Sequence, residues 1–136
     1  MLIDWTGDFD RWYDQLIQHA ESGDERSSEQ LALVDAELGV LQDLRVAPEA
    51  STPTLRRVSQ SRRYPVWRLA HPFVRGIAIR LIVWFPPDRP GAAVVVLLGA
   101  DKARMGDVFY DSVGPRADAA IDSYLFGTRT EGETDE

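Results

Sequence analysis

The chain has 136 residues and no cysteine, so the sequence predicts one domain without disulfides or thiolate metal ligands. Apolar residues make up 44%, and no apolar run approaches the roughly 18 residues of a membrane-spanning helix. The N-terminus is acidic where a signal peptide would be basic, which predicts a cytoplasmic protein. A net charge of -7 would on its own argue against a nucleic-acid partner.

The first 44 residues predict a strand followed by two helices. Residues 1–5 alternate as a short strand, and Thr6 or Asp8 can cap the next helix. A second helix is expected to begin near Ser27 or Ser28. Each helix has one apolar stripe, made of Phe9, Trp12, Tyr13, Leu16 and Ile17 in the first and of Leu31, Val34, Leu38, Leu41 and Leu44 in the second.

Between residues 54 and 100 the hydrophobic pattern changes from the period of a helix to that of strands. Four segments there are rich in β-branched and aromatic residues: LRRV, VWRLA, GIAIRLIVWF and AAVVVLL. The segment PPDRPG, residues 86–91, contains three prolines, which cannot donate in a sheet. It is therefore expected to be the loop of a hairpin that joins the last two strands.

A last helix is expected to begin near Gly114 and Pro115 and to end at Gly127. Its apolar side would consist of Ala117, Ala120, Ile121, Tyr124 and Leu125. The acidic residues 128–136 are expected to form a disordered tail. The order of elements predicts a single α+β domain over residues 1–127, with helices packed on a mostly antiparallel, twisted sheet.

The charges are divided unevenly along the chain. Residues 1–54 contain 12 acidic and 3 basic residues, and residues 105–136 contain 8 acidic and 2 basic residues. The segment between them contains 10 basic residues and only Asp88 and Asp101 as acids. A basic block of this kind is typical of phosphate-binding proteins. The alternative is that the block pairs with the acidic flanks inside one fold.

Alternation along the strands divides the basic residues between the two faces of the sheet. In GIAIRLIVWF the odd-numbered residues are apolar, so Arg80 lies on the opposite face. In VWRLAH a regular strand would place Arg68 and His71 on different faces. Lys102 and Arg104 follow the last strand. Together with the two strand arginines they would form a cationic patch that can hold a phosphodiester.

Two residues near this patch could transfer protons. His71 is the only histidine of the basic block, and an ordinary imidazole pKa of about 6.5 suits general acid or base chemistry. Tyr110 follows the basic cluster and could donate or accept a proton. Each also has a simpler interpretation, because His71 precedes a proline as loop residues do, and Tyr110 can pack in the core.

Seven segments occur in an order and spacing that resemble the RelE/ParE superfamily of bacterial toxins, especially its HigB-like branch. They are FDRWYDQL, LALVDAELGVL, TLRRV, VWRLAH, AIRLIVWF, VVVLLGADKAR and a helix near ADAAIDSYL, and they cover nearly the whole chain. The resemblance implies a RelE-like α+β fold whose sheet holds mRNA on the ribosome through basic residues. It also implies an antitoxin that blocks this surface, for which a helix-turn-helix protein is one candidate.

The resemblance further implies that mRNA is cleaved without a metal or cofactor, by attack of a 2′-hydroxyl on the adjacent phosphorus. This reaction needs a proton acceptor, cations around the phosphate and a proton donor. The turn that reads ADKAR departs from the family's aromatic residue and paired lysines, and no acid–base set of the family maps onto this chain. The candidates are Arg68, Arg80, Lys102 and Arg104 for phosphate binding and Arg80, His71 and Tyr110 for catalysis.

Three functions therefore follow as expectations. The first is a ribosome-dependent mRNA endonuclease that inhibits translation as the toxin of a toxin–antitoxin pair. The second is a ParE-like inhibitor that blocks DNA gyrase without catalysis. The third is an inactive binding module on the same fold, which the acidic flanks favour because they would weaken the approach to ribosomal RNA.

Overall fold

The structure of the protein is a computed structural model. It describes residues 1–59, 63–70, 76–89, 91–105 and 108–134, with side chains for all of these except 104–105, 108–111 and 128–134. Its elements are β1 (Leu2–Trp5), α1 (Gly7–Glu21), α2 (Glu25–Asp43), β2 (Leu55–Arg57), β3 (Val66–Ala70), β4 (Ile79–Trp84), β5 (Ala93–Asp101), α3 (Lys102–Met105) and α4 (Val108–Thr134).

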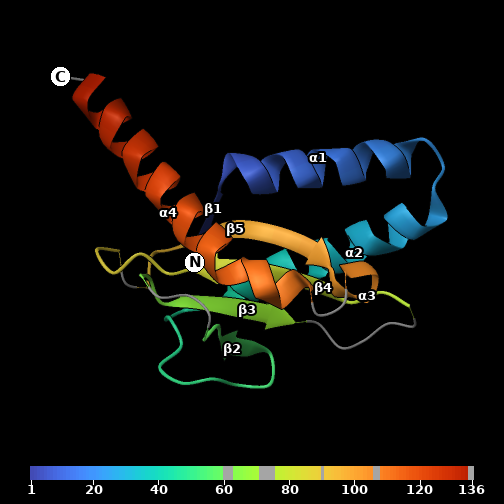
Figure 1. The fold of residues 1–136 in the computed structure, drawn as a ribbon, viewed down its shortest axis with the longest axis horizontal. Helices are drawn as coiled ribbons and strands as arrows, with labels where there is room; N and C mark the ends of the chain where they lie inside the picture. The colour runs from blue at the N-terminus through green and yellow to red at the C-terminus, as the bar shows by residue number, and fades with distance from the viewer. Residues whose placement is uncertain (60–62, 71–75, 90, 106–107, 135–136) are drawn as a thin grey trace.

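The five strands form one mixed sheet in the order β1-β5-β4-β3-β2. β1 runs parallel to β5, and every other neighbouring pair is antiparallel. α1 and α2 cover one face of the sheet and α4 crosses the other, as Figure 1 shows. The α+β class and the mostly antiparallel sheet that the order of elements predicted are therefore confirmed.

The alternation predicted for β4 is also confirmed, because its two sets of residues enter two separate apolar clusters. Odd-numbered residues of the β4 region pack with α1 and α2, whereas Ile82 and Trp84 pack with α4. The cluster beneath α1 and α2 includes Phe9, Leu16, Val34, Leu41, Ile77, Ile79, Leu81, Val83 and Phe85. The cluster beneath α4 includes Ile82, Trp84, Val95, Leu97, Val113, Ala117, Ala120 and Ile121.

A β-bulge in β5 changes which of its residues face the helices α1 and α2. Ile82 pairs with Leu98 while the next residue of β4 pairs with Val96, so Leu97 is the extra residue. Before the bulge even-numbered residues of β5 face α1 and α2, and after it odd-numbered residues do. Gly99 and Asp101 consequently point toward the two N-terminal helices.

The starts of the two N-terminal helices differ in how well the sequence predicted them. Thr6, one of the two caps that the sequence allowed, caps α1: its Oγ1 accepts from the Phe9 N–H at 3.2 Å and donates to the Leu97 carbonyl at 2.6 Å. α2 begins at Glu25, earlier than predicted, because Asp24 and not a serine is its N-cap. Ser27 instead donates to the carboxylate of Asp24 at 2.6 Å.

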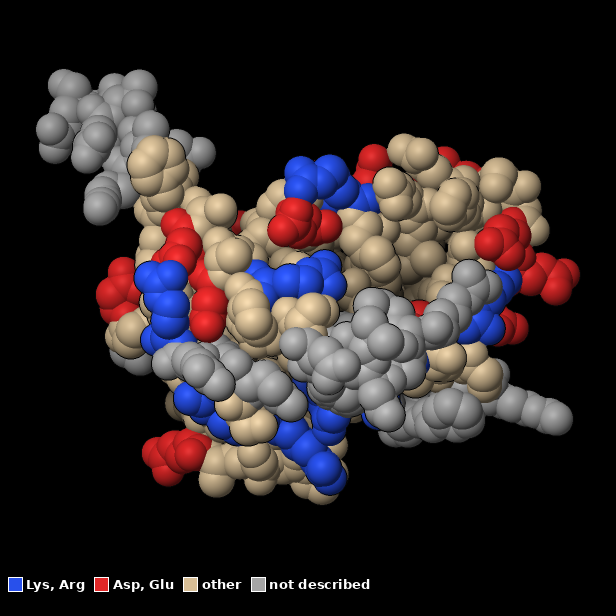
Figure 2. All heavy atoms as spheres, in the orientation of Figure 1, with Lys and Arg blue, Asp and Glu red and all other residues tan. Residues whose placement is uncertain are grey.

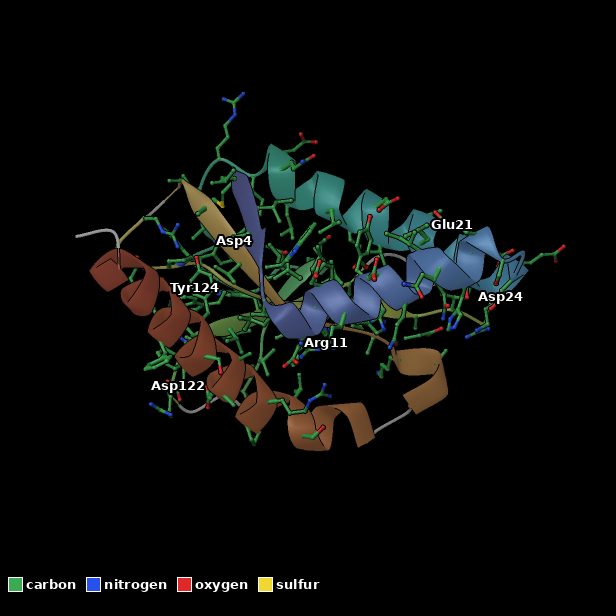
Figure 3. The ribbon with its side chains drawn as sticks, turned by 90° about the horizontal axis from the view of Figure 1, so that it is seen from above. Asp4, Arg11, Glu21, Asp24, Asp122 and Tyr124 are labelled. Carbon is green, nitrogen blue, oxygen red and sulfur yellow. The ribbon has the colours of Figure 1, made fainter. Side chains whose placement is uncertain are left out.

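Both predicted ends of the last helix are wrong. α4 begins at Val108, passes through Pro115 and Gly127, and continues to Thr134. Proline removes one helical hydrogen bond, and α4 changes direction in its first half, as Figures 1 and 3 both show. A glycine in a helix costs only about 1 kcal/mol, so Gly127 does not end α4. On the predicted apolar side Leu125 is 41% exposed, whereas Ala117, Ala120 and Ile121 are buried as expected.

The loop between β4 and β5 is the hairpin connection that its prolines predicted. The Arg89 N–H donates to the Pro86 carbonyl and the Ala92 N–H to the Arg89 carbonyl, both at 3.1 Å. Gly91 has a φ of 72°, a conformation that favours glycine. None of the helices in the described part of the chain combines the length and the apolar character needed to cross a membrane.

Candidate functional site

The structure places Arg68 and Arg80 on the same face of the sheet, the face that α4 crosses. In the register of β3 and β4, Arg68 lies opposite Ile82 and Arg80 lies opposite Ala70. Residues that lie opposite each other share a face, and a diagonal pair such as Arg68 and Arg80 lies roughly 7–8 Å apart between Cα atoms. Both arginines are half-buried. The two strand arginines singled out in the sequence are therefore neighbours.

A third arginine extends this face. Arg56 of β2 lies directly opposite Arg68 of β3 and is exposed. This pairing brings two guanidinium-bearing positions of adjacent strands directly opposite each other. Sequence analysis missed Arg56 because its face depends on the register of β2 and β3, which the spacing of LRRV and VWRLAH does not determine. We call Arg56, Arg68 and Arg80 the arginine face.

Arg80 has unused hydrogen-bonding capacity. Its Nη1 donates to the Ile79 carbonyl at 2.8 Å, while its Nε is buried and has no hydrogen-bond partner among the described residues. Within the same part of the chain, no carboxylate forms an ion pair with it. A buried N–H without a partner costs roughly 1–3 kcal/mol, and the structure retains this cost at Arg80.

Among the described residues, one arginine of the basic block is neutralised by a carboxylate of an acidic flank, as the alternative interpretation predicted. Arg63 forms an ion pair with Asp122 of α4, and Tyr64 donates to the same carboxylate at 2.7 Å. Asp101 at the end of β5 forms an ion pair with Arg26 of α2 at 2.7 Å. Both ion pairs lie outside the arginine face.

The remaining candidates are placed only in part. Lys102 is half-buried at the start of α3, and its N–H donates to the Ala78 carbonyl at 2.8 Å. It follows Ala100, which lies opposite Arg80. The backbones of Arg104 and Tyr110 lie in α3 and α4, but their side chains and the whole of His71 lie outside the described residues. Of the three catalytic candidates, the structure therefore describes the side chain of Arg80 alone.

The charges also separate on the surface. Figure 2 shows several basic side chains over the β2 and β3 side of the molecule, whereas over α4 and around α1 and α2 acidic side chains lie beside further basic ones. The β2 and β3 side in this view is therefore mainly basic, whereas both signs of charge occur over the helices. A polyanion would be attracted to the β2 and β3 side and repelled by the helices.

The end of β5 is fixed by the carboxylate of Asp101. Its Oδ1 accepts from the N–H groups of Ala78 at 2.9 Å and Ala103 at 3.0 Å, and its Oδ2 accepts from Arg26 at 2.7 Å and Gln30 at 2.8 Å. Burial alone would raise the pKa of Asp101, but these hydrogen bonds outweigh burial and hold the pKa below its ordinary value. Asp101 is therefore an ionised structural residue and has no role in the predicted patch.

Two clefts lie between α1 and α4. Figure 3 shows these two helices from above. The first, of about 430 Å³, lies beside β1, where the Tyr124 hydroxyl donates to Asp4 at 2.8 Å and accepts from Arg89 at 2.9 Å. The second, of about 560 Å³, is lined by Trp12 and His19 of α1, Gly99 of β5 and Arg116 of α4, among others. Neither cleft contains a residue of the arginine face.

Within the described residues, no three histidine, aspartate or glutamate side chains are grouped as a metal site would require. Comparison of the chain with protein-family models, with curated proteins and with solved structures finds no match in any of the three. The assignment of a function therefore depends on the residues and their arrangement.

Proposed function

We propose that the protein is a toxin of a toxin–antitoxin pair that binds mRNA phosphates on the arginine face and inhibits translation, as the resemblance to the RelE/ParE superfamily suggests. The observation that supports this best is the convergence of Arg56, Arg68 and Arg80 from three adjacent strands onto one face. Each is separated from the next in the sequence by about a dozen residues, so the cluster results from the fold and not from a local run of charge.

The order of elements supports the same proposal. An N-terminal strand, two helices, a mainly antiparallel run of strands and a C-terminal helix follow one another as a RelE-like toxin would require. The arginine face lies on the sheet and not on a loop, so its cations are held at fixed separations. A rigid array of cations is suited to a phosphodiester whose charge increases during cleavage.

In this proposal the residues have separate tasks. Arg56 and Arg68 hold the RNA backbone, and Arg80 stabilises the phosphate that is attacked through the charge of its guanidinium, which no described carboxylate neutralises. Lys102 and Arg104 extend the binding surface at the end of β5. His71 and Tyr110 are the candidates for proton transfer. A cognate antitoxin in the cytoplasm would cover the arginine face while translation proceeds.

The proposal is tested by inducing the chain in a bacterium, recording growth and mapping the 5′ ends of cellular mRNA. Wild type is expected to arrest growth and to produce new 5′ ends, and Arg80→Ala and Arg56→Ala to lose both effects. Arg56 is exposed, so its replacement should not affect folding. Arg45→Ala, an exposed arginine in the loop after α2, is the matched control and should behave as wild type.

Two results would contradict the proposal. In the first, growth is arrested while mRNA stays intact and gyrase supercoiling is blocked, which would indicate a ParE-like inhibitor. In the second, growth is unaffected by the folded wild-type chain, which would indicate a binding module without toxicity.

A further inference from the structure

β5 is longer than the strand beside it, which leaves part of its edge open. β1 pairs with β5 only from Ala93 to Val96. The Thr6 N–H then donates to the Val96 carbonyl at 3.1 Å, the Thr6 hydroxyl donates to the Leu97 carbonyl, and the chain turns into α1. From Leu98 to the end of β5, no strand of the described chain lies on this side.

The hydrogen-bond pattern directs the backbone of Gly99 toward that open edge. The Lys102 N–H donates to the Ala78 carbonyl at 2.8 Å, so Ala78 and Lys102 form a hydrogen-bonded pair. The next pair along the ladder, Ile79 and Asp101, is therefore not hydrogen-bonded. Pairs alternate along an antiparallel ladder, so Gly99 is not hydrogen-bonded to Leu81 either. The N–H and C=O of Gly99 therefore point away from β4, and no described loop or side chain bonds to them.

The outer strands of the sheet differ from this edge, because side-chain oxygens cover amides that point outward from them. Such caps are one way in which proteins prevent edge strands from pairing with other chains. The capped amides are Trp5, bonded to Asp4 Oδ1 at 2.8 Å, Leu55, bonded to Thr52 Oγ1 at 3.0 Å, and Arg57, bonded to Ser51 Oγ at 3.0 Å. Among the described residues, no comparable cap lies on Gly99.

The open edge forms the floor of the cleft of about 560 Å³, which lies between α1 and α4 as Figure 3 shows them. Trp12 of α1 lies against Gly99 on one side, and Arg116 of α4 lines the cleft from the other helix. Arg116 is exposed and forms no ion pair with a described carboxylate. The cleft therefore combines an unpaired strand edge, an aromatic wall and a cation. Its lining also includes two carboxylates, those of Asp24 and of Asp101, the second of which is paired with Arg26.

We propose that an extended segment of a partner protein, with one acidic side chain placed beside Arg116, binds in this cleft as an added strand beside Gly99. The segment would continue the line of β1 along β5, and its backbone would pair with the N–H and C=O of Gly99. Because side chains of a strand alternate between faces, one would pack on Trp12 while its neighbour reaches the Arg116 side. An aspartate or glutamate at that neighbouring position gives charge complementarity. This site is separate from the arginine face and does not depend on the function proposed for it.

The probe is a synthetic peptide of about six residues, the usual length of a strand, with alternating valine and threonine and a central glutamate. Amide exchange and chemical shifts of the full chain are followed by NMR as the peptide is added to millimolar concentration. In the free protein, the Gly99 amide is expected to exchange faster than that of Leu98, whose N–H faces β4. Bound peptide is expected to slow exchange at Gly99 about tenfold or more.

Matched peptides and variants separate backbone pairing from charge. N-methylation of the peptide amides on the pairing side should abolish binding. Arg116→Gln should lower the affinity for the glutamate peptide several-fold. It should not change the affinity for a peptide in which glutamine replaces the central glutamate. Arg45→Gln, at a site remote from the cleft, should change neither affinity.

Three outcomes would each overturn the proposal. The Gly99 amide could already be as protected as that of Leu98 in the free protein, the peptide could leave its exchange unchanged, or the N-methylated peptide could bind as well as the unmodified one.

Discussion

Asp101 shows how a residue of the basic block serves the fold. Its carboxylate joins β5 to α2 and to the start of β4 through four donors, and its side chain is only 6% exposed. Removing one partner of a buried charged pair costs about 3 kcal/mol or more, because the other charge is left without compensation. Here that other charge is the guanidinium of Arg26, which is 31% exposed.

Asp101→Asn is therefore expected to lower the free energy of unfolding by about 3 kcal/mol at neutral pH, measured by urea titration. The folded pKa of Asp101 is lowered below the unfolded value of about 3.9, so its contribution is present above that pH and lost as pH falls through the folded pKa. The variant should consequently lose less stability on acidification than wild type does. Asp8→Asn, in an exposed pair with Arg11, should change stability by less than about 1 kcal/mol.

An equal cost for both variants, or an unchanged acid dependence in Asp101→Asn, would contradict this account of the β5 terminus.

Gly99 is required by a close contact and not by its backbone angles. A Cβ at this position would lie 2.5 Å from Cζ3 of Trp12, closer than side-chain carbons approach. Gly99→Ala is expected to destabilise the protein by roughly 1–3 kcal/mol, because the indole must move within a packed layer. Thermal unfolding of the variant measures this cost.

Two further variants make that prediction specific. Gly39→Ala in α2, where a Cβ meets nothing within 4 Å, should stabilise the protein by up to about 1 kcal/mol. In a Trp12→Leu background the cost of Gly99→Ala should fall, since the clashing ring is absent. Additive costs in the double variant would show that Trp12 is not the obstacle.

At the scale of elements, α4 is fixed to the sheet by apolar packing at its middle and by polar contacts beyond it. Val113, Ala117 and Ile121 are fully buried against the sheet. Further along, the Tyr124 hydroxyl connects α4 to Asp4 of β1 and to Arg89 of the β4–β5 loop. The buried residues on both sides of Pro115 explain why α4 continues through this proline, which is a local signal only.

Tyr124→Phe is expected to lower the free energy of unfolding by about 1–2 kcal/mol, because two partly buried hydrogen bonds of one hydroxyl are lost. Ser123→Ala, at the neighbouring exposed position, should have almost no effect. Urea unfolding followed by tryptophan fluorescence measures both. A similar stability for the two variants would mean that the hydroxyl does not help to attach α4.

Periodicity predicted the elements well where one face is apolar and the other is mixed. The alternation of β4 and the Thr6 cap of α1 are two examples, since each depends on residues within one element. The bulge at Leu97 was not predictable, because residues on both sides of it are apolar and no alternation exists to be interrupted. The start of α2 was missed because aspartate and serine are comparable N-caps.

The candidate site was predictable only in part for a related reason. The face of Arg80 follows from the apolar neighbours in its own strand, whereas the position of Arg56 depends on how β2 pairs with β3. Pairing register is determined by the connection between strands and by packing over the whole sheet. Ion pairs such as that between Arg63 and Asp122 join distant parts of the chain and leave no local signal.

At the scale of the whole molecule, the net charge of -7 conceals a mainly basic side over β2 and β3. The acidic helices and the arginine face belong to one domain, and at physiological ionic strength charges beyond about 8 Å are largely screened from each other. A polyanion on the β2 and β3 side would therefore interact mainly with the local cations. The overall charge lowers the affinity at low salt without preventing binding.

The most direct test is the affinity of the protein for a labelled single-stranded RNA, measured by fluorescence anisotropy over a range of salt concentrations. The double variant Arg56→Gln/Arg68→Gln is compared with Arg11→Gln/Arg45→Gln, which has the same net charge. Each phosphate contact adds about 0.7 to the slope of log affinity against log salt, so the first variant should lose roughly 1.4 from the slope. The second should retain the slope of wild type. Equal losses in the two variants, or no salt-dependent binding by wild type, would contradict the proposal that the arginine face binds a polyanion.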